Sequence, residues 1–281
     1  MSTGNTRNAV SELRAAIGFL TPLGRSSPAP SPKTMAYFPV VGAVMGCALG
    51  NVWRSLGHRY KPLPAAALAV AADCALTGAL HLDGLADAAD GLLAHAPTKD
   101  RLEIMAEPGT GAFAAAAVAL AVTCRAAAMS AIEPSALLLA AVYCSSRSVM
   151  GLGARSLPYA RSTGLATAFL PDGEQAAAAA ALGTPPPQPG SPAFTDPVLA
   201  ACLGGLGAAC AFAYLSARRR GAVALAVGWA ASACVLGTAR RRIGGFTGDV
   251  LGAAGVVCEV TTLLALAKQH AQKGDGHWQA L

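Results

Sequence analysis

The sequence predicts an all-α protein: a polytopic integral membrane helical bundle of about seven transmembrane helices, forming a single domain over residues 1–281. Hydrophobic residues make up 54% of the chain and charged residues 13%, whereas about a quarter of a soluble domain is charged. The mean hydropathy is +0.46, and the apolar residues gather in long segments separated by short polar ones. This composition excludes an ordinary soluble domain.

Seven apolar segments are long enough, or nearly long enough, to cross a bilayer as helices. Their expected bounds are 39–53, 63–80, 112–132, 135–152, 197–216, 221–238 and 250–267. The first two flank a basic turn and should form a hairpin. Because several segments are short or rich in Ala and Gly, six or eight spans are alternatives to seven.

The polar stretches between the spans should share one side of the membrane. Residues 1–38 form a leader with an amphipathic helix near 8–20, and residues 172–196 form a low-complexity loop rich in Ala and Pro. If seven spans alternate, the leader emerges on the same side as the segments 81–111, 153–196 and 239–249. The Lys and Arg distribution weakly favours the cytoplasm for this side. We therefore expect a plasma (inner) membrane protein whose active site faces the cytoplasm.

The charge and the cysteines narrow the classes of partner. The net charge of +6 comes without a long basic run interleaved with aromatic residues, which excludes nucleic acid and favours membrane lipid and phosphate groups. All eight cysteines lie in apolar segments without the spacing of a zinc site, so we expect them to be packing residues. A homo-oligomer is compatible with these features.

The stretch 81–91 carries three carboxylates on what should be one helix face. Steps of four and three residues place Asp83, Asp87 and Asp90 within an arc of about 60°. Gly84 and Gly91 line the adjoining flank, where another backbone or a bulky ligand can approach. Three like charges on adjacent turns need a compensating cation, and oxygen ligands favour Mg²⁺ or Mn²⁺. The alternative is a plain polar lip where a membrane helix meets water.

The stretch 240–249 places a basic cluster before a glycine-rich turn. Arg241 and its neighbours, with Thr247, could hold phosphate, because arginines and glycine backbone N–H groups both bind it. Asp249 begins the next helix and would complete a metal shell started by the aspartate face. The alternative is a cytoplasmic basic cluster with an ordinary loop.

Other ionisable residues have weaker cases. Glu103 and Glu107 share one face of a short helix and could bind a metal or substrate; the alternative is a solvated helix in which Arg101 pairs with an acid. Arg155 and Arg161 are candidate phosphate ligands. The remaining candidates lie in or beside spans. Arg147 is a functional candidate, Glu259 is an intermediate case, and His81 is a helix-end residue. Arg125 and Asp73 are candidates too, but each stands alone in its segment, and a buried pair or a snorkelling side chain explains them at least as well.

Three motifs carry a resemblance to a known family. The stretches His81-Leu82-Asp83-Gly84-Leu85-Ala86-Asp87-Ala88-Ala89-Asp90-Gly91, Glu103-Ile104-Met105 and Gly244-Gly245-Phe246-Thr247-Gly248-Asp249-Val250-Leu251-Gly252 resemble the cobalamin synthase family of adenosylcobinamide-GDP ribazoletransferases. The resemblance implies a Mg²⁺-dependent membrane transferase. Such an enzyme attaches α-ribazole or its 5′-phosphate to adenosylcobinamide-GDP and releases GMP.

From this reading we predict the roles of the site residues. The catalytic carboxylates are Asp83, Asp87 and Asp90, which also bind Mg²⁺ together with Asp249; the substrate ligands are Glu103, Arg155, Arg161, Thr247 and Arg241. Asp90 or Asp87 could accept the proton of the attacking hydroxyl.

Three other functions stay open. The aspartate motif is also similar to that of CDP-alcohol phosphotransferases of phospholipid synthesis, although Asp83-Gly84 lacks their Asp-Gly-x-x-Ala-Arg continuation. A cation-coupled membrane transporter could use the aspartates as its cation site, but it would need paired broken helices in two repeats. A structural scaffold would have no use for clustered acids.

Overall fold

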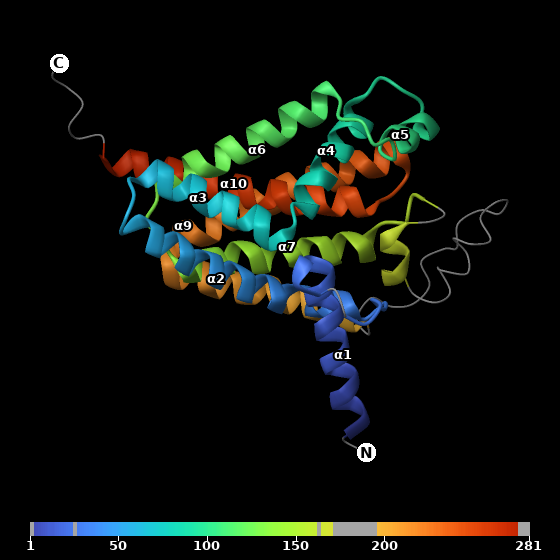
Figure 1. Cartoon of the computed structure of the whole chain (residues 1–281), viewed down its shortest axis with the longest axis horizontal. Coiled ribbons are helices and arrows are strands. Elements are labelled where there is room, and N and C mark those ends of the chain that lie inside the picture. The colour runs from blue at the N-terminus through green and yellow to red at the C-terminus, as the bar shows by residue number, and fades with distance from the viewer. Residues whose placement is uncertain (1–2, 25–26, 162–163, 171–195, 275–281) are drawn as a thin grey trace.

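A computed structural model describes residues 3–24, 27–161, 164–170 and 196–274, and these residues form helices that lie mostly along one axis (Figure 1). The helices are α1 Thr3–Leu20, α2 Phe38–Gly57, α3 Pro62–Thr77, α4 Leu80–Leu93, α5 Thr98–Ile104, α6 Ala112–Ser130, α7 Ala136–Ser156, α9 Pro197–Ile243 and α10 Gly248–Gly274, with 3-10 turns η1 Pro22–Gly24, η2 Thr34–Tyr37 and η3 Leu165–Phe169. The predicted all-α class is confirmed. Most of the predicted low-complexity loop lies outside the described residues.

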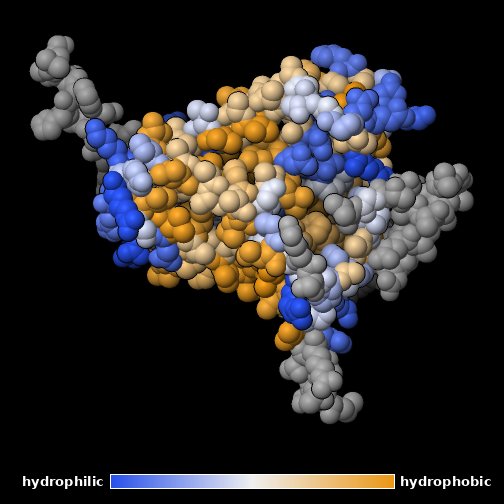
Figure 2. Space-filling view, in the orientation of Figure 1, coloured by the Kyte–Doolittle hydropathy of each residue, from blue (hydrophilic) through white to orange (hydrophobic). Residues whose placement is uncertain are grey.

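In the part of the chain that the structure describes, five helices are long and apolar enough to cross a membrane, or six if the bent pair α3–α4 is one span. Apolar surface covers the middle of the bundle, and hydrophilic residues gather towards its ends (Figure 2). This distribution is typical of a chain that crosses a bilayer several times. Among these five, α9 is a single helix, although its chain reverses within it.

The reversal in α9 lies at Arg218, whose backbone angles are φ 55° and ψ −145°. In a straight helix Ala213 and Gly221 would be about 12 Å apart along the axis. A Cβ built on Gly221 would instead lie 3.1 Å from the Cβ of Ala213. The arms 197–217 and 219–243 are therefore antiparallel, and they contain the two separate segments that the sequence predicts here.

The aspartate helix departs from its predicted place. From the sequence, 81–91 is expected to lie at the end of the apolar segment 63–80. In the structure α3 ends at Thr77, and α4 starts at Leu80 and is bent by 91° from α3. Gly78 (φ 60°) and Ala79 (φ 57°) both adopt left-handed conformations, which end an α-helix. The prediction missed the bend because the residues on both sides of it are apolar.

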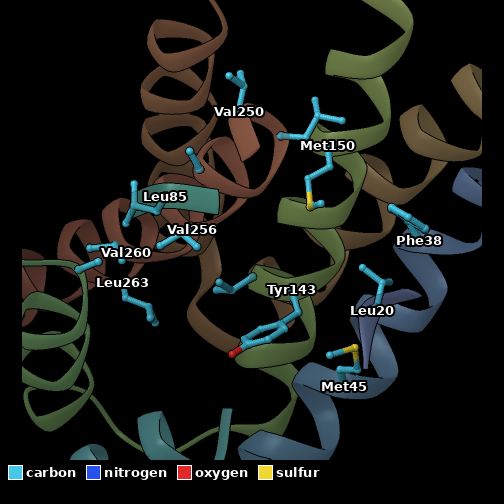
Figure 3. Close-up of a cluster of buried hydrophobic side chains, with 14 of the residues drawn as sticks. Leu20, Phe38, Met45, Leu85, Tyr143, Met150, Val250, Val256, Val260 and Leu263 are labelled. Atoms are coloured by element: carbon cyan, nitrogen blue, oxygen red, sulfur yellow. The ribbon is translucent and has the colours of Figure 1, made fainter. Parts of the chain in front are cut away.

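The core surrounds α7, the most buried of the membrane-spanning candidates. Figure 3 shows Tyr143 and Met150 of α7 with Met45 of α2 and Leu263 of α10 among the buried side chains. Close approach of α2 and α7 depends on glycine: a Cβ on Gly46 would collide with the backbone of α7. As the composition suggested, small residues allow tight packing where lipid provides no hydrophobic drive for helix association.

The four polar segments expected on one side do meet at one end of the bundle. Three hydrogen bonds link them. Thr98 Oγ1 donates to the carbonyl of Arg242 (3.0 Å), and the N–H of Ala160 donates to the carbonyl of Phe246 (2.9 Å). Arg155 Nη2 donates to the carbonyl of Pro32 (2.6 Å). These bonds join the leader, the segment 81–111, the loop after α7 and the turn between α9 and α10.

Candidate active site

The site is built where α4 crosses the start of α10. A Cβ placed on Gly84 would lie 3.0 Å from both the Cα and the carbonyl oxygen of Asp249, so the two backbones are in direct contact. Asp83 precedes this glycine, and Asp87 lies one turn beyond Asp83. The negative charges of Asp249, Asp83 and Asp90 act on the Asp87 carboxyl group, and the charge of Asp249 has the largest effect of the three. The predicted meeting of Asp249 with the aspartate face is therefore present.

This contact leads to a prediction about Gly84. In Gly84→Val the added side chain should push α4 away from Asp249, and misplacement by about 1 Å can cost on the order of a hundredfold in rate. We expect enzymatic turnover to fall by about that factor with the protein still in the membrane. Gly109→Val is the matched control, because a Cβ there meets nothing within 4 Å. Equal activity in the two variants would contradict the role of this crossing.

Asp249 is half-buried and has a cationic neighbour. Arg161 Nη1 lies 3.3 Å from Asp249 Oδ2, and Thr247 Oγ1 lies 3.2 Å from the same oxygen. The loop carrying Arg161 is fixed beside α10 by the contact of the Tyr159 ring with Phe246, whose centroids are 5.3 Å apart. Burial raises the pKa of the Tyr159 phenol, so this side chain stays neutral at neutral pH. Arg161 thus brings a positive charge to the carboxylates.

Asp90 has a second role that the sequence analysis did not predict. Its Oδ2 accepts a hydrogen bond from the N–H of Gly111 (2.6 Å), and its Oδ1 accepts one from the N–H of Ala114 (2.9 Å). Both carboxylate oxygens therefore cap the N-terminus of α6, where N–H groups lack partners within the helix. Its part in metal binding stays a prediction.

We expect Asp90→Ala to lower the free energy of unfolding by about 1–2 kcal/mol, because the loss of a helix N-cap costs about that much. Thermal or denaturant unfolding in detergent measures the loss. Glu107→Ala is a matched control, since this exposed acid makes no side-chain hydrogen bond or ion pair among the described residues. An unfolding midpoint unchanged by Asp90→Ala would show that the cap does not stabilise the fold.

Arg101 and Glu103, which lie near α4, make other contacts than those considered from the sequence. Arg101 Nη1 donates to the carbonyls of Gly91 and Leu92 (both 2.9 Å), and Arg242 also donates to that of Leu92. Arg101 therefore caps the C-terminus of α4 rather than pairing with an acid. Glu103 is exposed and lies 3.9 Å from Lys99 in a surface ion pair. The structure does not bring Glu103 to the carboxylates.

Two further predicted substrate ligands also lie apart from Asp83 and Asp87. Arg155 holds segments together: its Nε lies 2.8 Å from an Asp196 oxygen, and its Nη1 donates to the carbonyl of Phe169 (2.8 Å). Arg241 is exposed and donates from Nε to the carbonyl of Gly237 within its own helix (3.2 Å). Of the five predicted substrate ligands, the structure places Arg161 and Thr247 beside Asp249.

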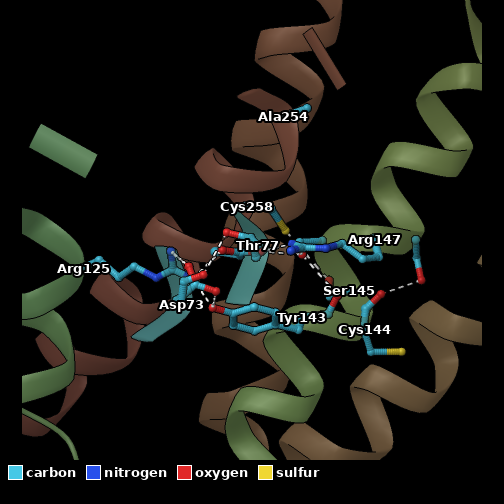
Figure 4. Close-up of polar contacts among 12 residues, drawn as sticks. Asp73, Thr77, Arg125, Tyr143, Cys144, Ser145, Arg147, Ala254 and Cys258 are labelled. Carbon is cyan, nitrogen blue, oxygen red and sulfur yellow. Dashed lines mark hydrogen bonds and ion pairs between the residues drawn. The ribbon is translucent and has the colours of Figure 1, made fainter. Parts of the chain in front are cut away.

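A buried ionic network lies in the middle of the bundle. The buried-pair alternative for Asp73 and Arg125 is confirmed, because Arg125 Nη1 lies 2.9 Å from Asp73 (Figure 4). The Nη2 of Arg125 lies 2.6 Å from Glu259. The Tyr143 hydroxyl donates to Asp73 (2.5 Å), and Arg147 pairs with Glu259. Two acids and two arginines from α3, α6, α7 and α10 thus compensate one another. Their equal and opposite charges within apolar segments were the signal available in the sequence.

His81 fits its prediction as a helix-end residue, since it is the second residue of α4. Its side chain is buried, and neither ring nitrogen has a hydrogen-bond partner among the described residues. The helical period turns it away from the aspartate face. It is not placed to act as a base on a substrate held by the carboxylates.

The donor chemistry of the site fits magnesium. Among the described residues no three His, Cys, Asp or Glu side chains are gathered closely enough to hold a metal ion by themselves. Magnesium sites in phosphoryl transfer commonly use one or two carboxylates together with substrate phosphates and water. Asp83, Asp87 and Asp249 supply such oxygens around the α4–α10 crossing.

Comparison with known proteins agrees with the motifs. The chain is 36% identical over 238 residues to an adenosylcobinamide-GDP ribazoletransferase of Syntrophobacter fumaroxidans, covering 84% of this chain and 86% of that protein. It is 34% identical over 275 residues to one of Bradyrhizobium diazoefficiens, covering 94% and 96%. No solved structure matches it. Residues 12–267 match the family described as cobalamin-5-phosphate synthase, and the chain belongs to this family.

Proposed function

We propose that the protein is an adenosylcobinamide-GDP ribazoletransferase, which joins α-ribazole or its 5′-phosphate to adenosylcobinamide-GDP and releases GMP. The family match over residues 12–267 carries this proposal, because it spans every element of the site. The relatives named above bear the same activity in their names. The contact between the aspartate helix and Asp249 supports it from the structure.

The reaction moves a phosphoryl centre from one oxygen to another. A ribose hydroxyl of the acceptor attacks the phosphorus next to cobinamide, the bond from that phosphorus to the bridging oxygen breaks, and GMP leaves with the electron pair. The hydroxyl proton passes to a carboxylate, for which Asp87 is the candidate because the charges of Asp249, Asp83 and Asp90 act on it and favour its protonated form. Arg161 is placed to bind a phosphate oxygen beside Asp249.

Carboxylates and a diphosphate repel one another, so the site requires positive charge in addition to Arg161. Asp83, Asp87 and Asp249 would hold magnesium together with the substrate phosphates, and the ion would supply this charge and stabilise the negative charge on the departing phosphate. Asp90 joins this ligand set only if it gives up a bond to the start of α6.

The site faces the cytoplasm in this proposal, and the protein resides in the plasma membrane of the cell. The convergence of the leader, the segment 81–111 and the turn before α10 at one end supports a single functional side. Arg240, Arg241 and Arg242 lie at that end, in agreement with the enrichment of basic residues on cytoplasmic faces.

The family match disfavours the two other activities that the sequence left open, a CDP-alcohol phosphotransferase and a cation-coupled transporter. Both would use carboxylates at a membrane surface, so the aspartate face alone did not separate them. A transporter releases no GMP, which makes product analysis decisive.

The test uses purified full-length protein in detergent, supplied with adenosylcobinamide-GDP, Mg²⁺ and either α-ribazole or α-ribazole 5′-phosphate. We expect GMP to appear only when an acceptor is present and to disappear when a chelator is added. Absence of GMP with both acceptors, from protein that unfolds cooperatively, would overturn the activity. GMP release that persists in the presence of the chelator would overturn only the role of magnesium and not the activity.

A further inference from the structure

An apolar groove lies behind the aspartate helix. It encloses about 290 Å³ between α4, α6, α9 and α10. Five residues of α4 line the groove: Leu85, Ala88, Ala89, Leu92 and Leu93. By the helical period the first four point about 130–170° away from the aspartate face, and Leu93, at the end of α4, lies about 90° from it. The helix that carries the carboxylates therefore separates the groove from the candidate active site.

The groove is set in apolar surface at the polar end of the bundle. Ala117 and Ala253 contribute to it from near the starts of α6 and α10, and Thr238 contributes near the end of α9. On α6, Phe113 and Leu120 beside it are 45% and 64% exposed. In a chain that crosses a bilayer, such surface faces acyl chains at the level just below the lipid headgroups.

Two arginines stand at the polar end of this groove. Arg241 and Arg242 follow Thr238 by three and four residues, so they lie one turn further along α9 on the same side. Arg242 donates to the carbonyl of Leu92, a residue of the groove wall. Arg240 is also exposed, but the helical period points it away from the groove.

These arginines lack acidic partners. Within the described residues no Asp or Glu forms an ion pair with Arg240, Arg241 or Arg242. Guanidinium groups bind phosphate through paired N–H donors, and basic residues at a membrane surface attract anionic headgroups. The combination of an apolar groove with unpaired arginines at its headgroup end matches one chemical class, a lipid with an acyl chain and an anionic phosphate.

We infer that an anionic phospholipid binds here, with an acyl chain in the groove between α4 and α9 and its phosphate at Arg241 and Arg242. The bound lipid packs on the back of α4 and steadies the helix that presents Asp83 and Asp87. The site is separate from that of the nucleotide substrate, so its existence does not depend on the proposed activity.

The test measures lipid binding rather than turnover. Full-length protein in dodecyl maltoside is titrated with phosphatidylglycerol or phosphatidylcholine in mixed micelles, and retained lipid is counted by native mass spectrometry alongside the thermal unfolding midpoint. We expect phosphatidylglycerol to be retained and to raise the midpoint, with no comparable effect of phosphatidylcholine or of inorganic phosphate alone. Equal effects of the two lipids would overturn the phosphate contact.

Matched variants locate the site. Arg241→Gln should weaken phosphatidylglycerol binding about fivefold, the effect of one basic residue at a membrane surface, whereas Arg240→Gln should leave it unchanged. Thr238→Phe should fill the groove and abolish retention without removing a charge. Equal losses in the two arginine variants, or undiminished binding in Thr238→Phe, would overturn the inference. So would a stable dimer that buries the groove.

Discussion

Replacing Asp83 or Asp87 with Asn is expected to lower GMP release by at least about a hundredfold, a typical cost of removing one group that stabilises charge in a transition state. Both side chains flank the contact of Gly84 with Asp249, and Asp87 lies in the fields of the other carboxylates. Asn preserves the shape but removes the negative charge, so binding of magnesium and uptake of the hydroxyl proton should both fail. Turnover of the two purified variants measures the effect.

Asp100→Asn provides the matched control. Asp100 is an exposed acid on α5, at the same end of the bundle as the carboxylates, and the substitution is chemically identical. We expect its turnover to equal that of the unmodified protein. Near-normal GMP release from Asp83→Asn, with membrane retention unchanged, would remove that carboxylate from the mechanism.

Arg125→Leu is expected to reduce the free energy of unfolding by about 3–5 kcal/mol, because removing one partner from a buried ionic network leaves uncompensated charge. Arg125 bonds Asp73 on α3 and Glu259 on α10, and all three side chains are buried. The variant would leave both acids with one cation, Arg147. Denaturant unfolding in detergent, followed by near-ultraviolet spectroscopy, measures the loss.

Two comparisons separate the network from a general effect of losing an arginine. Arg219→Leu, at an exposed position in the turn of α9, should change stability by less than about 1 kcal/mol. A double-mutant cycle with Asp73→Asn should show a coupling of about 1–3 kcal/mol, since the two side chains share a hydrogen bond. Independent effects of the two substitutions would contradict the network as described.

The network also bears on the site, because it ties together the two helices that lead to it. Asp73 lies four residues before the end of α3, and the bend at Gly78 and Ala79 then starts α4. Glu259 lies ten residues after Asp249 on α10. Arg125 thus holds α3 against α10 at a point deeper in the bundle than the crossing of α4 and α10.

The sequence by itself determined the features that depend on local periodicity and composition. Apolar segments long enough to span lipid fixed the helical membrane class. The steps of four and three residues placed Asp83 and Asp87 on one helix face, and Gly84 marked the point where another backbone could approach. The long motifs also identified the family, which the comparison confirmed.

Only the tertiary structure decided which distant residues meet. Asp90 turns to the start of α6, Arg155 binds Asp196, and Arg125 joins two acids that lie 52 and 134 residues away in the chain. A helical period fixes the direction of a side chain on its own helix but contains nothing about the group opposite it. That group is set by helix crossings, by the bend at Gly78 and by the chain reversal at Arg218, where close packing selects a single arrangement.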